Sequence, residues 1–161
     1  DEMGIDKDQI DAIRMAGVIH DLGKIYIPAE ILNKPGDLST GEFSLIKSHP
    51  EAGYDILKYI DFPWPIGTIL LQHHERLDGS GYPHGLRGDQ ICLEARILSV
   101  ADVVESMSSH RPYRPALGME RALSEISSLR GVLFDSTVVD ACLKICEKNT
   151  FVFGSREATM A

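Results

Sequence analysis

Four histidines and two aspartates stand out as potential metal ligands. Each lies next to another potential ligand in the sequence, or lies within or at the end of an apolar helical stretch. Neutral imidazole and carboxylate together suit iron, manganese, cobalt, nickel or zinc, whereas magnesium prefers oxygen ligands alone. Six ligands exceed what one four-coordinate ion requires, so the set predicts two divalent ions that share a bridging carboxylate. The six residues are His20, Asp21, His49, His73, His74 and Asp102.

Taken singly, these residues have plainer interpretations. A single histidine is more often a core or surface residue than a ligand, and Asp102 belongs to a polar stripe with Glu105 that would also suit an exposed helix face. Asp102 also stands among three valines, where a buried carboxylate is costly unless it is paired or binds a cation. The metal prediction therefore depends on the set and not on any one member.

Lys24 follows His20 by four residues and Asp21 by three. A helix continued by one more turn would bring its ammonium group to the face that carries both ligands, where it could hold a phosphate oxygen. The alternative is a solvated lysine at a helix end, where the helix dipole favours a positive charge. Spacing alone leaves both interpretations open.

Helices are the elements that must position these side chains. Apolar residues recur at the helical period in most of the chain, and Asp6 with Gln9 and Ser39 with Glu42 are capping pairs. No segment alternates with the period of a strand, so the pattern predicts an all-α fold, with Gly23 at a helix end. The predicted helices cover residues 6–19, 39–48, 50–60, 65–74, 93–109, 119–129 and 136–148.

One long segment, residues 78–89, lacks helical periodicity and contains four glycines. This composition is typical of a structured loop. Tyr82 within it has two interpretations, a packing residue that fixes the loop or a side chain that contacts a ligand. The residues expected to shape the loop are Asp78, Gly79, Gly81 and Pro83.

Composition narrows the classes of function. The 161-residue chain has 43% hydrophobic and 25% charged residues, which suits one globular domain over residues 1–150 with a tail at 151–161. A formal charge of −8 argues against a nucleic-acid polymer as ligand. No apolar run approaches the ~20 residues that span a bilayer, and the acidic start does not resemble a signal peptide, so we expect a cytoplasmic protein.

Cys92, Cys142 and Cys146 are an odd number of cysteines, which argues against a disulfide framework. Cys142 and Cys146 lie one helical turn apart and could hold a metal as thiolates. Their apolar neighbours favour packing in a helical core instead. We therefore leave them out of the predicted site.

Five ordered sequence blocks resemble the HD-GYP family of the HD metallohydrolase superfamily. A histidine–aspartate pair alone is common, but five blocks in the same order over about residues 16–148 are a specific match. The blocks are HDLGK at 20–24, HPEAG at 49–53, HHERLDGSGYP at 73–83, RILSVAD at 96–102 and RPYRPA at 111–116.

The resemblance implies a compact helical bundle around a metal centre, with roles for individual residues. It implies that His20, Asp21 and Asp102 bind one ion, and that Asp21 bridges to a second. His49, His73 and His74 would complete the second site, and iron or manganese are the expected metals. Lys24 would contact the scissile phosphate. Side chains in positions that contact or shape the nucleotide pocket are Tyr82, Glu105, Arg111 and Arg114.

The implied activity is hydrolysis of cyclic di-GMP to linear pGpG by water activated between two metal ions; whether a second cut to GMP follows stays open. Family members carry a further ligand on an upstream helix that we do not find before His20, so a third metal is doubtful. The family also implies sensory receiver, PAS or GAF modules and diguanylate cyclase (GGDEF) domains as partners. Two alternatives stay open: a sensor or docking module without turnover, and an HD hydrolase for another nucleotide.

Overall fold

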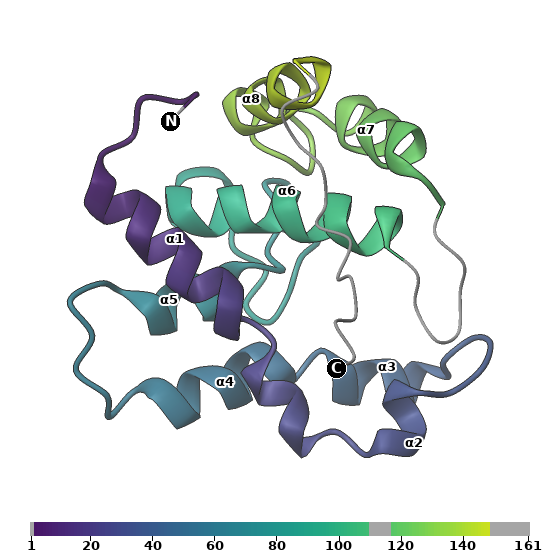
Figure 1. The fold of residues 1–161 in the computed structure, drawn as a ribbon. Helices are drawn as coiled ribbons and strands as arrows, with labels where there is room; N and C mark the ends of the chain where they lie inside the picture. The colour runs from purple at the N-terminus through teal and green to yellow at the C-terminus, as the bar shows by residue number, and fades with distance from the viewer. Residues whose placement is uncertain (1, 110–116, 149–161) are drawn as a thin grey trace, which may run out of the picture.

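The computed structural model describes residues 2–109 and 117–148, which form helices joined by loops (Figure 1). Within these residues, strand-like pairing is limited to two isolated bridges, so the predicted all-α fold is confirmed. The predicted boundary between domain and tail at residue 150 lies outside them. The helices are α1 (Lys7–Ile19), η1 (Leu22–Tyr26), α2 (Ala29–Leu32), α3 (Thr40–Ile46), α4 (His49–Leu57), α5 (Ile66–Gln72), η2 (Gly88–Gln90), α6 (Leu93–Ser108), α7 (Met119–Ser128) and α8 (Ser136–Glu147), where η1 and η2 are 3-10 helices.

Helix α6 lies between two groups of helices and contributes to two hydrophobic cores (Figure 1). One face of α6 packs with α1 and α5 through buried residues such as Ala95 and Leu98. The other face packs with α7 and α8 through Val100 and Val104. Because α6 contributes to both cores, the helix that carries Asp102 is packed on two sides.

Local sequence signals place most helix ends correctly. The Asp6 side chain accepts a hydrogen bond from the Gln9 backbone N–H at 2.8 Å, and Ser39 and Glu42 form the predicted reciprocal capping box. Helix α4 ends at Leu57, earlier than predicted, and the four-residue helix α2 was not predicted. The long helices needed to position the site are those with the clearest periodicity.

The prediction that Gly23 ends a helix is wrong. Helix α1 ends at Ile19, and Gly23 lies inside η1. A Cβ at Gly23 would lie 1.9 Å from the His49 carbonyl oxygen and 2.6 Å from the Gly53 nitrogen. Glycine is therefore required because η1 and α4 touch through their backbones, and this contact holds Asp21 close to His49.

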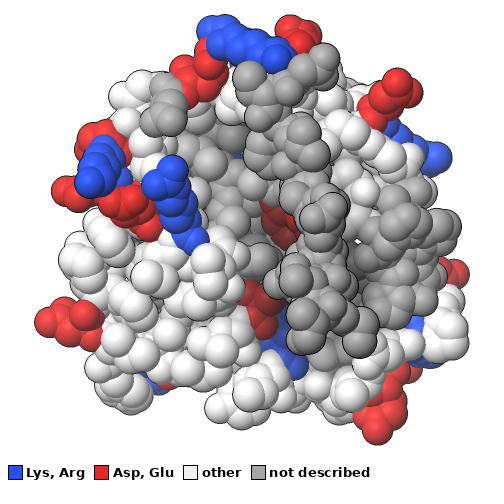
Figure 2. Space-filling model, viewed as in Figure 1, with Lys and Arg blue, Asp and Glu red and all other residues white. Residues whose placement is uncertain are grey.

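A cysteine of α8 packs against a core, and the basic side chains on one face are scattered. Cys142 packs against the core formed by α6, α7 and α8, and burial raises the pKa of its thiol to about 11. On the face shown in Figure 2, described lysines and arginines lie apart from one another or beside acidic residues. None of the helices in the described ranges is both long and apolar enough to cross a bilayer.

Candidate metal centre

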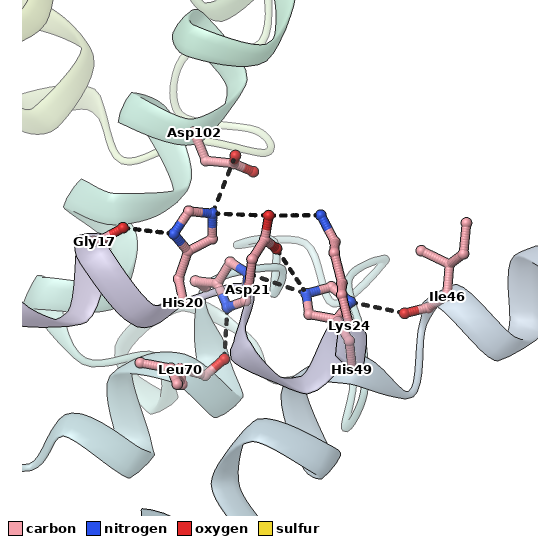
Figure 3. A network of polar contacts seen from close by, with 9 residues as sticks. Gly17, His20, Asp21, Lys24, Ile46, His49, Leu70 and Asp102 are labelled. Carbon is pink, nitrogen blue, oxygen red and sulfur yellow. Dashed lines mark hydrogen bonds and ion pairs between the residues drawn. The ribbon is translucent and has the colours of Figure 1, made fainter. Parts of the chain in front are cut away.

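Three histidines are oriented by carbonyl groups at the ends of three helices. The Nδ1 atoms of His20, His49 and His73 lie 2.7, 2.7 and 2.6 Å from the carbonyl oxygens of residues 17, 46 and 70 (Figure 3). These carbonyls belong to the last turns of α1, α3 and α5, where helix geometry leaves them without an amide partner. Because a carbonyl only accepts, each Nδ1 carries the proton and each Nε2 keeps a free lone pair.

Two of these lone pairs face Asp21, and the third, on His73, faces His49. The Nε2 atom of His20 lies 3.5 Å from Asp21 Oδ2, and that of His49 lies 3.6 Å from Asp21 Oδ1 (Figure 3). His20 Nε2 also lies 3.8 Å from Asp102 Oδ1, and His49 Nε2 lies 3.4 Å from His73 Nε2. Four separate segments therefore bring these residues together: the end of α1, the start of α4, the end of α5, and α6.

The arrangement fits a cation better than a hydrogen-bond network. Two Nε2 atoms that both lack a proton, in His49 and His73, face each other without a donor between them. The buried Oδ1 of Asp21 has no hydrogen-bond partner in the described part of the chain, which is rare for a buried carboxylate oxygen. Ligand atoms of His49, His73 and His74 lie within 4.8 Å of one another. Donor type, orientation and the unpartnered oxygen all suit an intermediate divalent ion.

Electrostatics keep the imidazoles in the form that binds metals. Burial lowers the pKa of His49 and His74 and lowers that of His73 to about 3. Burial alone would raise the pKa of Asp21, but the charge and the hydrogen bond of the Lys24 ammonium hold it below its usual value. At neutral pH the site therefore offers neutral imidazoles and an ionised carboxylate.

Lys24 lies where its spacing predicted, although by a different local structure. Its Nζ atom donates to Asp21 Oδ2 at 2.7 Å, and the turn between them is the 3-10 helix η1 and not a continued α-helix. The ammonium group is therefore held at the edge of the ligand cluster (Figure 3). A phosphate oxygen bound beside Asp21 would lie within its reach.

The glycine-rich loop covers one side of the cluster. Tyr82 stacks on His74, with ring centroids 4.8 Å apart and an interplanar angle of 28°. Burial raises the pKa of Tyr82 to about 12, so its phenol stays protonated. A Cβ at Gly81 would lie 2.4 Å from the Arg76 nitrogen, which explains the glycine beside Tyr82. The loop therefore packs against the histidine cluster, which agrees with the prediction of a structured loop in this segment.

Comparison with known proteins decides the family. A model of the HD domain matches residues 1–138. The chain belongs to the HD domain family. It is 44% identical over 150 residues to a cyclic di-GMP phosphodiesterase response regulator of Xanthomonas campestris, covering 89% of this chain and 39% of that protein. It is 35% identical to a 3′3′-cGAMP-specific phosphodiesterase of Vibrio cholerae, covering 89% and 33%.

A solved structure supports the same fold. An HDG"Y"P protein from Bdellovibrio bacteriovorus matches with a TM-score of 0.71 at 19% identity, covering 89% of this chain and 45% of that one. Together with the HD-domain match and the curated relatives, this shared fold confirms the predicted resemblance to the HD-GYP family. The HD-GYP domain described here spans about two fifths of the length of the first curated relative.

Glu75 is a residue of the HD-GYP domain that sequence reasoning missed. It is 2% exposed, and its carboxylate accepts from the backbone N–H groups of His84 at 2.7 Å and Leu86 at 3.0 Å. These two bonds tie the glycine-rich loop to the end of α5, directly after His74. Its sequence signal was weak, since a carboxylate after two histidines is equally consistent with an exposed helix end.

The remaining predicted residues fall into three groups. Glu105 lies half-buried on α6, one turn after Asp102. Asp78 accepts from the Ser80 backbone N–H at 2.9 Å, in keeping with a loop-shaping role, and Pro83 follows a cis peptide bond. Arg111 and Arg114 lie outside the described residues.

Proposed function

We propose that this HD-GYP domain is a metal-dependent phosphodiesterase that hydrolyses cyclic di-GMP to linear pGpG. The observation that carries the proposal is the approach of the His20 and His49 Nε2 atoms to Asp21, whose buried Oδ1 has no hydrogen-bond partner within the described residues. A curated relative 44% identical to the chain bears the name of a cyclic di-GMP phosphodiesterase. The chemistry of the cluster and that name point to the same reaction.

The proposed ligands divide between two ions. His20, Asp21 and Asp102 would hold one, and Asp21, with His49, His73 and His74, would hold the other. Iron or manganese is favoured, and zinc, nickel or cobalt would suit the same donors. When bound, such a pair of ions lowers the pKa of water and neutralises charge on a phosphoryl group.

The protein's own residues would orient and stabilise the substrate. Lys24 would bind a non-bridging phosphate oxygen. Its positive charge would stabilise the negative charge that grows on this oxygen as the bond to the 3′ oxygen breaks. Tyr82 would border the nucleotide through the loop that Glu75 fixes. Arg111, Arg114 and Glu105 are proposed nucleotide contacts on the strength of the family resemblance.

The test is turnover by the purified chain. The chain would be purified without oxygen and loaded with Mn²⁺, and its products would be separated by chromatography. We expect it to convert cyclic di-GMP to pGpG, and we expect EDTA to abolish this conversion. Tight binding without any product would favour the sensor alternative. Metal analysis of the same samples by X-ray fluorescence would report which ion is bound and how many.

A second cyclic dinucleotide belongs in the same assay, because one relative bears the name of a 3′3′-cGAMP-specific phosphodiesterase. We expect cyclic di-GMP to be preferred, and a preference for 3′3′-cGAMP or a nucleoside triphosphate would reject this substrate. Control by receiver, PAS or GAF modules, with substrate made by a diguanylate cyclase, belongs to the same proposal.

A further inference from the structure

A cavity of about 780 Å³ adjoins the metal centre between η1, α2 and α3. Two of its lining residues also belong to the centre: Lys24 donates to Asp21, and the Ile46 carbonyl accepts from His49 (Figure 3). A ligand whose phosphate lies at Lys24 would therefore extend directly into this cavity. Its volume is within the ~300–1,000 Å³ typical of small-molecule sites.

The cavity wall is apolar on one part and acidic on another. Phe43 lines it with 45% of its surface exposed, and Leu38 lines it nearby. Asp37 also lines it, is exposed, and makes no hydrogen bond or ion pair within the described ranges. An aromatic face suits a nucleobase, because base–aromatic stacking contributes ~1–3 kcal/mol.

The wall is held in place before any ligand arrives. Lys34 lines the cavity, and its Nζ donates to both Glu42 oxygens at 2.9 and 2.7 Å. Glu42 in turn accepts from the Ser39 N–H at 2.7 Å, and the contacts with Lys34 and Ser39 lower its pKa to about 2. Lys34 is paired with Glu42, and Lys24 is paired with Asp21. The Lys47 ammonium lies 4.8 Å from the Phe43 ring centroid, which leaves the other face of the ring for a base. Asp37 is therefore the charged lining residue without a hydrogen bond or ion pair in the described part of the chain.

We propose that this cavity binds a guanine base of the substrate, stacked on Phe43, with Asp37 accepting hydrogen bonds from the guanine N1–H and 2-amino groups. Lys24 attracts the phosphate and Asp37 repels it, so phosphate and base take opposite positions. Adenine has an unprotonated N1 and no 2-amino group, so it lacks the two donors that Asp37 would bind, and Asp37 would determine specificity for guanine. The inference deepens the proposed function and names where part of its substrate binds.

Calorimetry with GMP and AMP on the Mn²⁺-loaded chain tests the site without turnover. We expect GMP to bind more tightly than AMP. Phe43→Leu should weaken both about tenfold, and Phe43→Tyr should restore them, since stacking requires a ring. Asp37→Asn should weaken GMP about tenfold and leave AMP unchanged, since a hydrogen bond to a charged acceptor is lost.

Matched controls come from the same surface. Leu45 is 50% exposed on α3, and Asp61 is exposed after α4, and neither lines the cavity. Leu45→Ala and Asp61→Asn should leave both affinities unchanged. In hydrolysis, Phe43→Leu should raise KM for cyclic di-GMP about tenfold with kcat within twofold.

The outcomes separate this inference from the proposed function. Normal hydrolysis with unchanged GMP affinity and KM in Phe43→Leu and Asp37→Asn would overturn the inference alone. Selective GMP binding that depends on both residues, in a chain that hydrolyses no cyclic dinucleotide, would support the inference and reject the enzyme. An equal loss of affinity for GMP and for AMP in Asp37→Asn would overturn the role of Asp37 in specificity.

Discussion

Two pairs of potential metal ligands lie on opposite sides of α6 and behave differently. His73 and His74 face other ligands, and His73 is oriented by a backbone carbonyl. Cys142 and Cys146 line an apolar cavity of about 280 Å³ between α6, α8 and the N-terminal segment. Burial and the neighbouring Cys146 raise the pKa of Cys142, which keeps it a thiol. Ligand type and close spacing are therefore insufficient; orientation by acceptors and convergence with other segments make a metal site.

The largest expected effect breaks the histidine side of this comparison. Asp21→Asn removes the negative charge and one carboxylate oxygen beside the His20 and His49 imidazoles. The affinity for metal should therefore fall sharply. Turnover of cyclic di-GMP should fall more than about 100-fold, beyond the loss usual for residues that only support ligands. Metal content by mass spectrometry and product by chromatography would be measured together.

Cys142→Ala is the matched control for this change. It removes a potential ligand of the other pair, and metal content should stay unchanged. Loss of metal in Cys142→Ala, or full metal content in Asp21→Asn, would show that the two regions have been assigned the wrong way round.

The next effect tests how the histidine side is positioned. In Gly23→Ala, the new Cβ would meet the His49 carbonyl at 1.9 Å and force η1 away from α4. We expect the free energy of unfolding to fall by about 3 kcal/mol or more, with weaker metal binding. Gly41→Ala in α3 has nothing within 4 Å and should be neutral or stabilising in urea titrations. Equal stability of the two variants would contradict this role for Gly23.

Gly23 and Glu75 show where sequence reasoning reaches its limit. The long helices and the grouping of His20, Asp21 and Lys24 could be predicted, because periodicity, capping pairs and ordered motifs are local or nearly local signals. The need for glycine at position 23 arises from a contact with α4, and the burial of Glu75 arises because residues 84–86 fold over it. Neither contact has a periodic signal, since both depend on tertiary packing.

Glu75 gives a third, smaller effect that separates the loop from the metals. In Glu75→Gln, one amide N–H group would face a backbone N–H of His84 or Leu86 instead of accepting from it. We expect a loss of about 1–3 kcal/mol in stability and about tenfold in kcat/KM, with metal content retained. The control is Glu51→Gln, because Glu51 lies 3.7 Å from the exposed His84 side chain and does not hold the loop backbone. Metal loss in Glu75→Gln would mean that Glu75 acts on the ligands directly.

The smallest effects concern how the free energy of unfolding depends on pH. They are measured in EDTA, so that no metal is bound, and they contrast the histidine pair with the cysteine pair. The pKa values of His49, His73 and His74 are lowered from 6.5, so the unfolded chain binds protons first as the pH falls. Stability is therefore fully present above about pH 6.5 and is lost as the pH falls below it, toward the folded pKa of about 3 for His73. The urea concentration at the midpoint of unfolding should therefore decrease as the pH is lowered from 7.5 to 5.5.

Cys142 should act at the other end of the scale. Its pKa is raised from 9.0 to about 11, so its contribution is present below pH 9 and is lost as the pH rises toward 11. Because the Cys142 side chain is partly exposed, its contribution to the free energy of unfolding is at most about 2 kcal/mol. Cys142→Ala should reduce the loss of stability between pH 8.5 and 10 and leave the acid side unchanged, whereas His73→Gln should do the reverse. If Cys142→Ala altered the acid side, the two ligand pairs would be electrostatically coupled across α6, and the contrast between them would fail.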